Sequence, residues 1–297
     1  MPRSSALPVL AALSLLLVAS TASAQGVAKD SSGESSPPPR LASGLTAGSL
    51  RYTGGRAEEA ASAVLKVRLS HGLFASIEPT VARATEPAAG VYPAASNTGL
   101  TDIPVALEFE RELGGLLSPT LGLSLGATLP VGNTATGFGT GVVGTSIDVG
   151  GGVSPTEELS LYAGAGKTLS NVTAQSAFNG GASGWADLGV TFQTTDRLAL
   201  LGGFATDLGA IDTAYGRGRS LSAGVSYALA GPLALNIQTS HGLGGATPRW
   251  SAVVGIGTAF GALEGARELR NAFGGGRHGL SKKGSGSSSS GRGRGHA

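Results

Sequence analysis

The chain repeats short segments in which apolar residues alternate with small or polar residues. From Leu233 to Gln238, leucine and isoleucine alternate with alanine, asparagine and glutamine, and residues 121–129 alternate leucine or alanine with glycine, serine and threonine. Successive side chains of a β-strand point to opposite sides, so each segment has one apolar and one polar face. Segments of about ten residues with this alternation are typical of a transmembrane β-barrel, whose apolar face meets lipid and whose polar face lines the lumen.

The alternation predicts an all-β fold, an antiparallel up-and-down barrel of about twelve strands. The expected strands are 45–53, 62–70, 72–83, 101–112, 119–130, 141–153, 157–169, 184–194, 197–208, 219–229, 232–242 and 249–260. Short connections (71, 113–118, 154–156, 195–196 and 230–231) alternate with longer ones (84–100, 131–140, 170–183 and 209–218). Outer-membrane barrels have short periplasmic turns and longer outside loops, so both termini are expected in the periplasm. A soluble β-sandwich, the alternative fold, has no need of this alternation.

Four regions are expected along the chain. Residues 1–24 combine a basic start, a short apolar run and an A-x-A site that ends at Ala24, which is the pattern of a secretory signal peptide. Residues 25–43 are rich in serine and proline and predict a disordered linker. The barrel is expected over 44–260, and the Gly/Ser-rich, basic segment 261–297 is expected to be a disordered tail.

Composition favours a channel wall over a soluble enzyme. Glycine accounts for 50 of the 297 residues, and 13% of the residues are charged, which is about half of the usual fraction near 25%. With no cysteine, the chain has no disulfide framework, thiolate zinc site or cysteine nucleophile. The net charge of +2 belongs to the tail, where seven basic and two acidic residues give +5 and leave −3 for the remainder.

Strand parity predicts which polar side chains face the lumen. A Lys or Arg that faces lipid at mid-depth costs about 2–4 kcal/mol, so charged strand residues are expected to point inward. The predicted pore-lining residues are Lys66, Arg68, Glu78, Asp102, Glu108, Asp148, Asp187, Asn236 and Gln238. Two interpretations stay open: a mixed-charge constriction that filters solutes, or ion pairs of Lys66 and Arg68 with Glu78 and other acids that brace or plug the interior.

No catalytic or metal site is expected. A lipid-modifying enzyme, which some small barrels are, needs a nucleophile with a base within reach. Ser240 and His241 are adjacent in sequence but face opposite sides of one strand. Neither a metal-ligand cluster nor a phosphate loop is apparent, because Leu161 stands where the loop that would end at Gly166-Lys167-Thr168 needs glycine. The sequence therefore predicts no enzyme, no cofactor and no metal.

Three stretches resemble a known family. They are 129–141, with Leu-Pro-Val-Gly-Asn and Thr-Gly-Phe-Gly-Thr-Gly; 147–166, with Ile-Asp-Val-Gly and Tyr-Ala-Gly-Ala-Gly; and 241–250, with Gly-Leu-Gly-Gly-Ala-Thr-Pro-Arg-Trp before the last strand. In this order they resemble the outer-membrane transporter family similar to the meta-pathway of phenol degradation. The resemblance implies an outer-membrane channel and leaves the solute open. Gly244-Gly245-Ala246 lacks the aspartate usual in the last turn, and Thr247 replaces the serine.

The sequence thus predicts a passive outer-membrane channel for small solutes, in a bacterium with two membranes. The alternatives are a closed barrel with a structural or surface-interaction role, a lipid-modifying enzyme and a soluble secreted β-sandwich. Expected partners are outer-membrane lipid and lipopolysaccharide, a small solute and the barrel-assembly machinery, with no nucleic acid.

Overall fold

The computed structural model describes residues 41–89, 93–113, 117, 119–136, 138–170, 184–208, 218–229, 233–244 and 247–258. The predicted signal peptide, most of the predicted linker and the basic tail lie outside the described residues. No helix in these ranges is long and apolar enough to cross a membrane.

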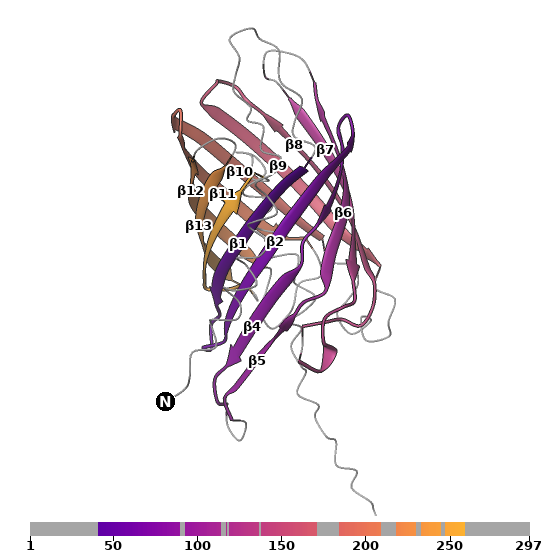
Figure 1. Cartoon of the computed structure of the whole chain (residues 1–297). Coiled ribbons are helices and arrows are strands. Elements are labelled where there is room, and N and C mark those ends of the chain that lie inside the picture. Colours follow the sequence, from indigo (N-terminus) through magenta and orange to yellow (C-terminus); the bar gives the residue numbers. More distant parts are fainter. Residues whose placement is uncertain are drawn as a thin grey trace, which may run out of the picture.

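The described chain forms one antiparallel sheet that closes on itself (Figure 1). Strand β1 pairs with β2 on one side and with β14 on the other, which completes the ring. The strands are β1 (Leu41–Arg51), β2 (Ala57–Ser70), β3 (Leu73–Ile77), β4 (Thr80–Glu86), β5 (Ala95–Leu100), β6 (Ile103–Glu112), β7 (Thr120–Leu129), β8 (Gly144–Val153), β9 (Leu159–Ser170), β10 (Gly184–Thr195), β11 (Leu198–Asp207), β12 (Arg219–Ala228), β13 (Ala234–Gly244) and β14 (Trp250–Gly257). This closure excludes a two-sheet sandwich.

The fourteen strand segments make twelve spanning strands. Both β3 and β4 pair with β2, while β5 pairs with β4 and β6 pairs with β3. The β3–β4 and β5–β6 pairs are therefore two long strands, each with one short interruption. Pro79 lies in the first interruption, where it has no backbone N–H to donate to the ladder. Across the break, the Thr101 amide donates to the Thr80 carbonyl at 2.9 Å. The predicted twelve-stranded barrel is confirmed.

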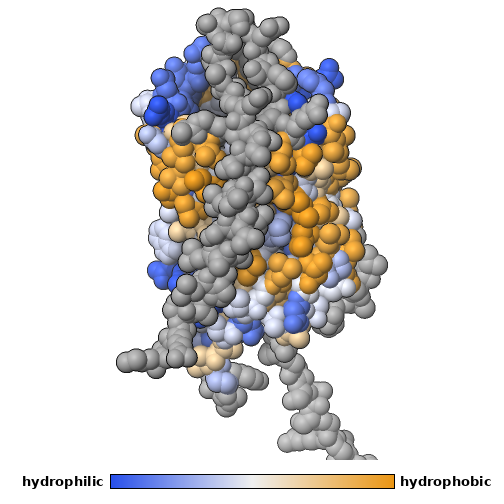
Figure 2. Space-filling model, in the orientation of Figure 1, coloured by the Kyte–Doolittle hydropathy of each residue, from blue (hydrophilic) through white to orange (hydrophobic). Residues whose placement is uncertain are grey.

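The two faces of the wall differ as the alternation predicts. On β7 the exposed side chains are leucines, and glycine, serine and threonine occupy the intervening positions. The same division recurs on β10 and β13, where Leu188 and Ile237 are exposed and Asp187 and Asn236 are buried. Figure 2 shows the outward apolar side chains as a belt around the middle of the visible face, with hydrophilic residues toward both ends. This belt is the lipid-facing surface of a transmembrane barrel.

The two ends of the barrel also differ. The β2–β3 turn is tight and needs glycine at position 72. The φ of Gly72 is +73°, and a Cβ at this position would overlap the Glu110 carbonyl oxygen. At the opposite end, the β4–β5 hairpin extends beyond the neighbouring strands (Figure 1). The expected 84–100 loop is thus mostly strand, with a connection of 87–94. Strand β1 begins at Leu41, inside the segment 25–43 expected as a linker.

A matched pair of substitutions on β13 tests the assignment of the faces. We expect Ile237→Lys to destabilise the barrel by about 2–4 kcal/mol, since it places a charge in the lipid-facing belt. Gln238→Lys changes the adjacent inward residue and serves as the control. The measurement is the denaturant concentration at the midpoint of unfolding for the protein folded in lipid vesicles. Unfolding is monitored by the loss of the heat-modifiable gel shift. Equal loss of stability in both variants would contradict the assignment.

Candidate functional site: the inner wall and the mouth

The structure places all nine predicted pore-lining residues on the inner side of the wall. Lys66 and Arg68 lie on β2, Glu108 on β6, Asp148 on β8, Asp187 on β10, and Asn236 and Gln238 on β13. Each alternates with an outward apolar neighbour. Glu78 and Asp102 occupy the two strand interruptions. Whether these residues contact a passing solute stays a prediction.

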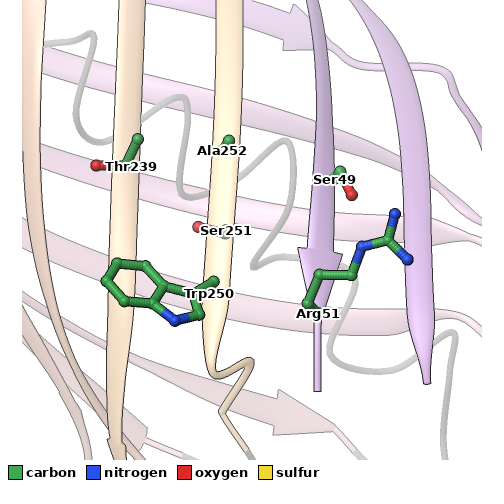
Figure 3. A pocket seen from close by; sticks show the side chains of 6 residues that line it. All are labelled: Ser49, Arg51, Thr239, Trp250, Ser251 and Ala252. Atoms are coloured by element: carbon green, nitrogen blue, oxygen red, sulfur yellow. The ribbon is translucent and has the colours of Figure 1, made fainter. Parts of the chain in front are cut away.

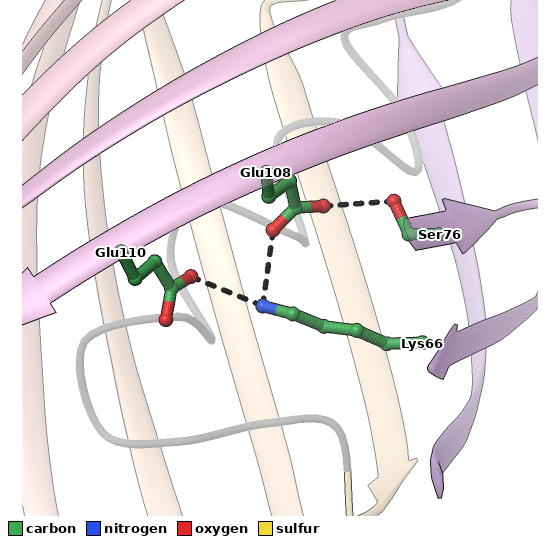
Figure 4. A network of polar contacts seen from close by, with 4 residues as sticks. All are labelled: Lys66, Ser76, Glu108 and Glu110. Atoms are coloured by element: carbon green, nitrogen blue, oxygen red, sulfur yellow. Dashed lines mark hydrogen bonds and ion pairs between the residues drawn. The ribbon is translucent and has the colours of Figure 1, made fainter. Parts of the chain in front are cut away.

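Lys66 is the centre of an ion cluster that joins two strands (Figure 4). Its Nζ lies 3.0 Å from Glu108 Oε2 and 3.1 Å from Glu110 Oε1. Ser76 Oγ, on the intervening strand β3, donates to Glu108 Oε1 at 2.7 Å. The ammonium also lies 4.7 Å from the Phe74 ring centroid. Lys66 is only 5% exposed, so its ammonium group needs these carboxylates as partners. The ion pairs and the Ser76 hydrogen bond connect the inner surfaces of β2, β3 and β6.

The expected pairing of Lys66 with Glu78 is not observed. Lys66 pairs instead with acids of β6, because the register sets Ser76 opposite Lys66 and brings the β6 glutamates within reach diagonally. Within the described ranges, no carboxylate oxygen lies within 4.0 Å of an Arg68 nitrogen. The side chain of Glu78 is buried at 8% exposure. Within the described ranges, the predicted brace of ion pairs therefore involves Lys66 but not Arg68, and its acids are Glu108 and Glu110 rather than Glu78.

Asp102 has a different environment from the other inward acids. Its carboxylate accepts hydrogen bonds from the Gly132 amide at 2.9 Å, from the Thr140 amide at 2.7 Å and from the Thr140 hydroxyl at 2.7 Å. Its own amide donates to the Phe138 carbonyl at 3.2 Å. These four bonds fasten the β7–β8 loop to the interruption between β5 and β6. Asp102 was expected to line the pore, and the structure instead makes it the anchor of a loop.

Phe138 completes this anchor from the apolar side. Its side chain is fully buried at 0% exposure and packs with Ala82 and Ala84, on the inner face of β4. Gly99 of β5 leaves room for the ring, since a Cβ there would lie 3.0 Å from a ring carbon. The β7–β8 loop is therefore held by polar and apolar contacts against the inner face of the β4–β5 hairpin. The loop therefore lies at the end of the barrel where that hairpin extends.

The glycines of the same loop allow it to turn back on itself. Gly132 and Gly139 face each other so closely that a Cβ on either would overlap the backbone of the other segment. This contact explains two of the glycines in the Leu-Pro-Val-Gly-Asn and Thr-Gly-Phe-Gly-Thr-Gly stretches. Sequence reasoning found the motif but assigned it no structural role. The repeated glycines on both sides of Phe138 were the sequence feature that could have indicated a loop folded back on itself.

A second polar cluster at this mouth was not predicted. Arg56 lies 2.8 Å from Glu58 and 3.8 Å from Glu86, and the Tyr52 hydroxyl donates to Glu58 at 3.0 Å. Arg56 and Tyr52 belong to the β1–β2 connection, whereas the acids belong to β2 and β4. The cluster ties this connection to the β4–β5 hairpin. Arg56, Glu58 and Glu86 lie between the predicted strands, so strand parity gave no signal that could reveal the cluster.

The outer wall carries a shallow groove near the same end (Figure 3). It is lined by Ser49, Arg51, Thr239, Trp250, Ser251 and Ala252. The Trp250 ring lies against the His241 ring at a tilt of 47°, with ring centroids 4.4 Å apart. Both rings follow the outward parity of their strands, as predicted for His241. The groove therefore lies on the lipid-facing side and is separate from the inner wall.

The geometry of β13 disfavours a Ser/His catalytic pair. The Ser240 hydroxyl lies 2.6 Å from the Ser251 hydroxyl, while His241 contacts the Trp250 ring on the opposite side. In the described part of the chain, no three His, Cys, Asp or Glu side chains are grouped as metal ligands.

Comparison with known proteins supports the channel fold. No protein-family model matches the chain, and no curated protein matches it. Among solved structures, the chain is similar to an outer membrane channel from Pseudomonas putida F1, with a TM-score of 0.57, 12% identity and coverage of 77% of this chain and 98% of that one. It is also similar to the NanC porin, with a TM-score of 0.50, 12% identity and coverage of 72% and 98%. The chain thus has the barrel fold of outer-membrane channels. The link to a phenol pathway stays a prediction.

The anchoring role of Asp102 can be tested by hydrogen exchange. In Asp102→Asn, one carboxylate acceptor becomes an N–H donor that faces the Gly132 or Thr140 amide. Hydrogen bonds to charged groups contribute about 1.5–3 kcal/mol, so we expect exchange of the loop amides to accelerate at least about tenfold. Asp148→Asn neutralises an inward carboxylate of β8, outside this loop, and is the control. Unchanged exchange in Asp102→Asn would contradict the anchor.

Proposed function

We propose that the protein is a passive channel for small solutes in the outer membrane of a bacterium with two membranes. The observation that carries the proposal is the closed twelve-strand wall with an apolar outer face and a polar inner face. An interior of eight strands is just filled by side chains, whereas sixteen or more strands leave an aqueous channel. Twelve strands lie between these sizes, and the many inward glycines and serines leave more of the cross-section to solute.

Two features of the inner wall define the proposed path. The β7–β8 loop, held by Asp102 and Phe138, narrows the mouth where the β4–β5 hairpin extends. The Lys66 cluster lies in the half of β2 near the β2–β3 turn, toward the opposite end. A solute that enters at the mouth meets these two features in sequence. The mouth is the outside end, because the short turns of such barrels face the periplasm.

The second candidate function is a closed barrel with a surface-interaction role. The observation that favours it is the packed arrangement of the β7–β8 loop and the β4–β5 hairpin, which together present an ordered surface at the outside end. This function predicts a folded barrel that carries no current.

Outer-membrane lipid is the proposed structural partner of the outer wall. Outward strand positions carry five basic residues and one acid: Arg51, Arg83, Arg111, Lys167, Arg219 and Glu59. Long basic side chains near strand ends place their charges at the membrane interface, where lipid phosphates lie. Lipopolysaccharide supplies such phosphates in the outer leaflet. Assembly by the barrel-assembly machinery is proposed from the fold class.

Cysteine scanning of the cysteine-free chain tests the channel function. We expect discrete single-channel currents in planar bilayers, and a water-soluble charged thiol reagent should change the current of Gln238→Cys. Ile237→Cys, one residue away on the lipid face, should be unaffected. The heat-modifiable gel shift establishes that each variant is folded. A folded barrel without current would reject the channel and favour the closed-barrel function.

A further inference from the structure

The groove on the outer wall is bordered by a cation and an aromatic ring (Figure 3). The strand ladder sets Arg51 of β1 opposite Trp250 of β14, and Trp250 opposite His241 of β13. Trp250 is 53% exposed, and the Arg51 side chain is 62% exposed. A positive charge and an open indole ring are therefore both available to a molecule that enters the groove from the lipid side.

The groove continues from these two side chains toward the apolar belt. Its floor consists of small residues, which occupy the outward positions one row closer to the middle of the barrel: Ser49, Ala252 and Thr239. The next outward row already belongs to the belt, with Val254 at 44% exposure and Ile237 at 47%. A molecule in the groove would thus meet a polar, aromatic surface at one end and an apolar surface at the other, as an amphipathic ligand requires.

Basic residues outnumber acidic ones around the groove. The outward strand positions of β12, β13, β14, β1, β2 and β4 carry three arginines, Arg219, Arg51 and Arg83, and one acid, Glu59. Their formal charges give +2. Glu59 lies 3.9 Å from Arg51, and both side chains are more than half exposed. Exposed ion pairs of this kind contribute little free energy, so Arg51 remains able to bind a second anion.

The chemistry of this surface fits a phosphorylated glycolipid. A guanidinium group can bind a phosphate through two parallel hydrogen bonds. The indole ring of Trp250 has an apolar face that can cover a sugar ring, and tryptophan is favoured where one side is apolar and the other is wet. The groove lies at the end with the longer connections, which is the outside end of such barrels. The lipid that presents phosphate, sugar and acyl chains together in the outer leaflet is lipopolysaccharide.

We propose that the groove binds the lipid anchor of one lipopolysaccharide molecule. A phosphate lies at Arg51, a sugar ring covers Trp250, and an acyl chain follows the small residues of the floor to the apolar belt. The inference rests on the proposed contact of the outer wall with outer-membrane lipid and adds a defined site to it. It holds for an open and for a closed lumen alike. The bound lipid would lie over the β14–β1 pairing that closes the barrel.

Binding of lipid A to the folded full-length chain in detergent micelles tests the inference. The probe is bisphosphorylated, hexa-acylated lipid A, and bound lipid is counted by native mass spectrometry during a titration. We expect one lipid A molecule to be retained. Arg51→Gln removes the charged phosphate donor and should raise the Kd at least about tenfold. Trp250→Leu keeps an apolar residue but loses the ring, and should raise the Kd about threefold.

Arg111→Gln is the matched control. Arg111 is an outward residue of β6 near the short-turn end, opposite Leu121 in the ladder. The same substitution there should leave the Kd for lipid A unchanged. The heat-modifiable gel shift establishes that each variant is folded before it is titrated.

Two further probes separate lipopolysaccharide from other sources of phosphate and acyl chains. Lipid A without its phosphates and phosphatidylglycerol, a phospholipid, should each bind at least about tenfold more weakly than the bisphosphorylated form. Phosphatidylglycerol that binds as tightly as lipid A would overturn the inference, as would unchanged lipid A binding in Arg51→Gln. Either result would leave the channel function untouched, because that function fails only if a folded barrel carries no current in planar bilayers.

Discussion

The structure depends on one constraint, which is that every backbone N–H and C=O group within the bilayer must be paired. Lipid offers no hydrogen-bonding partner, and a sheet meets the constraint only by closing. Strand β1 does this by pairing with β2 over its whole length and with β14 over Gly44 to Arg51. The wall can therefore tolerate an interruption only where other groups replace the ladder. At Pro79, the neighbouring amides and carbonyls on both sides continue the pairing.

Closure gives each strand one face toward lipid and one toward the lumen, and the two faces carry side chains of different size. On the inner face, glycine allows large residues to lie across neighbouring strands. A Cβ at Gly189 would overlap the Tyr162 ring, and one at Gly166 would overlap Trp185. Such pairs keep aromatic rings flat against the wall instead of projecting toward the axis. Part of the abundance of glycine is thus a consequence of a wall that packs bulky residues across neighbouring strands on its inner surface.

Strand number and face assignment could be predicted because period-two patterning records whether each residue meets lipid or the lumen. Asn236, Gln238 and His241 lie on the faces that parity assigned to them. The role of Asp102 could not be predicted this way, since its partners are backbone amides of residues 30 and 38 positions further along the chain. The β4–β5 hairpin was expected as a loop because Ala95–Leu100 is rich in small polar residues on both faces. Strand β5 forms through its pairing with β4 rather than through burial in lipid.

The same division between a lipid-facing and an inward face accounts for the excess of basic residues at outward strand positions. An outward acid near the outside end would face lipid phosphates of its own sign, whereas an outward base is attracted to them. Glu59, the outward acid of the described strands, lies 3.9 Å from Arg51 and opposite Arg83 in the ladder, so basic neighbours offset its charge. Inward positions face no lipid, so this attraction does not bias the sign of their charges. The net charge of the whole chain sums the two faces and the basic tail, and it therefore describes neither face.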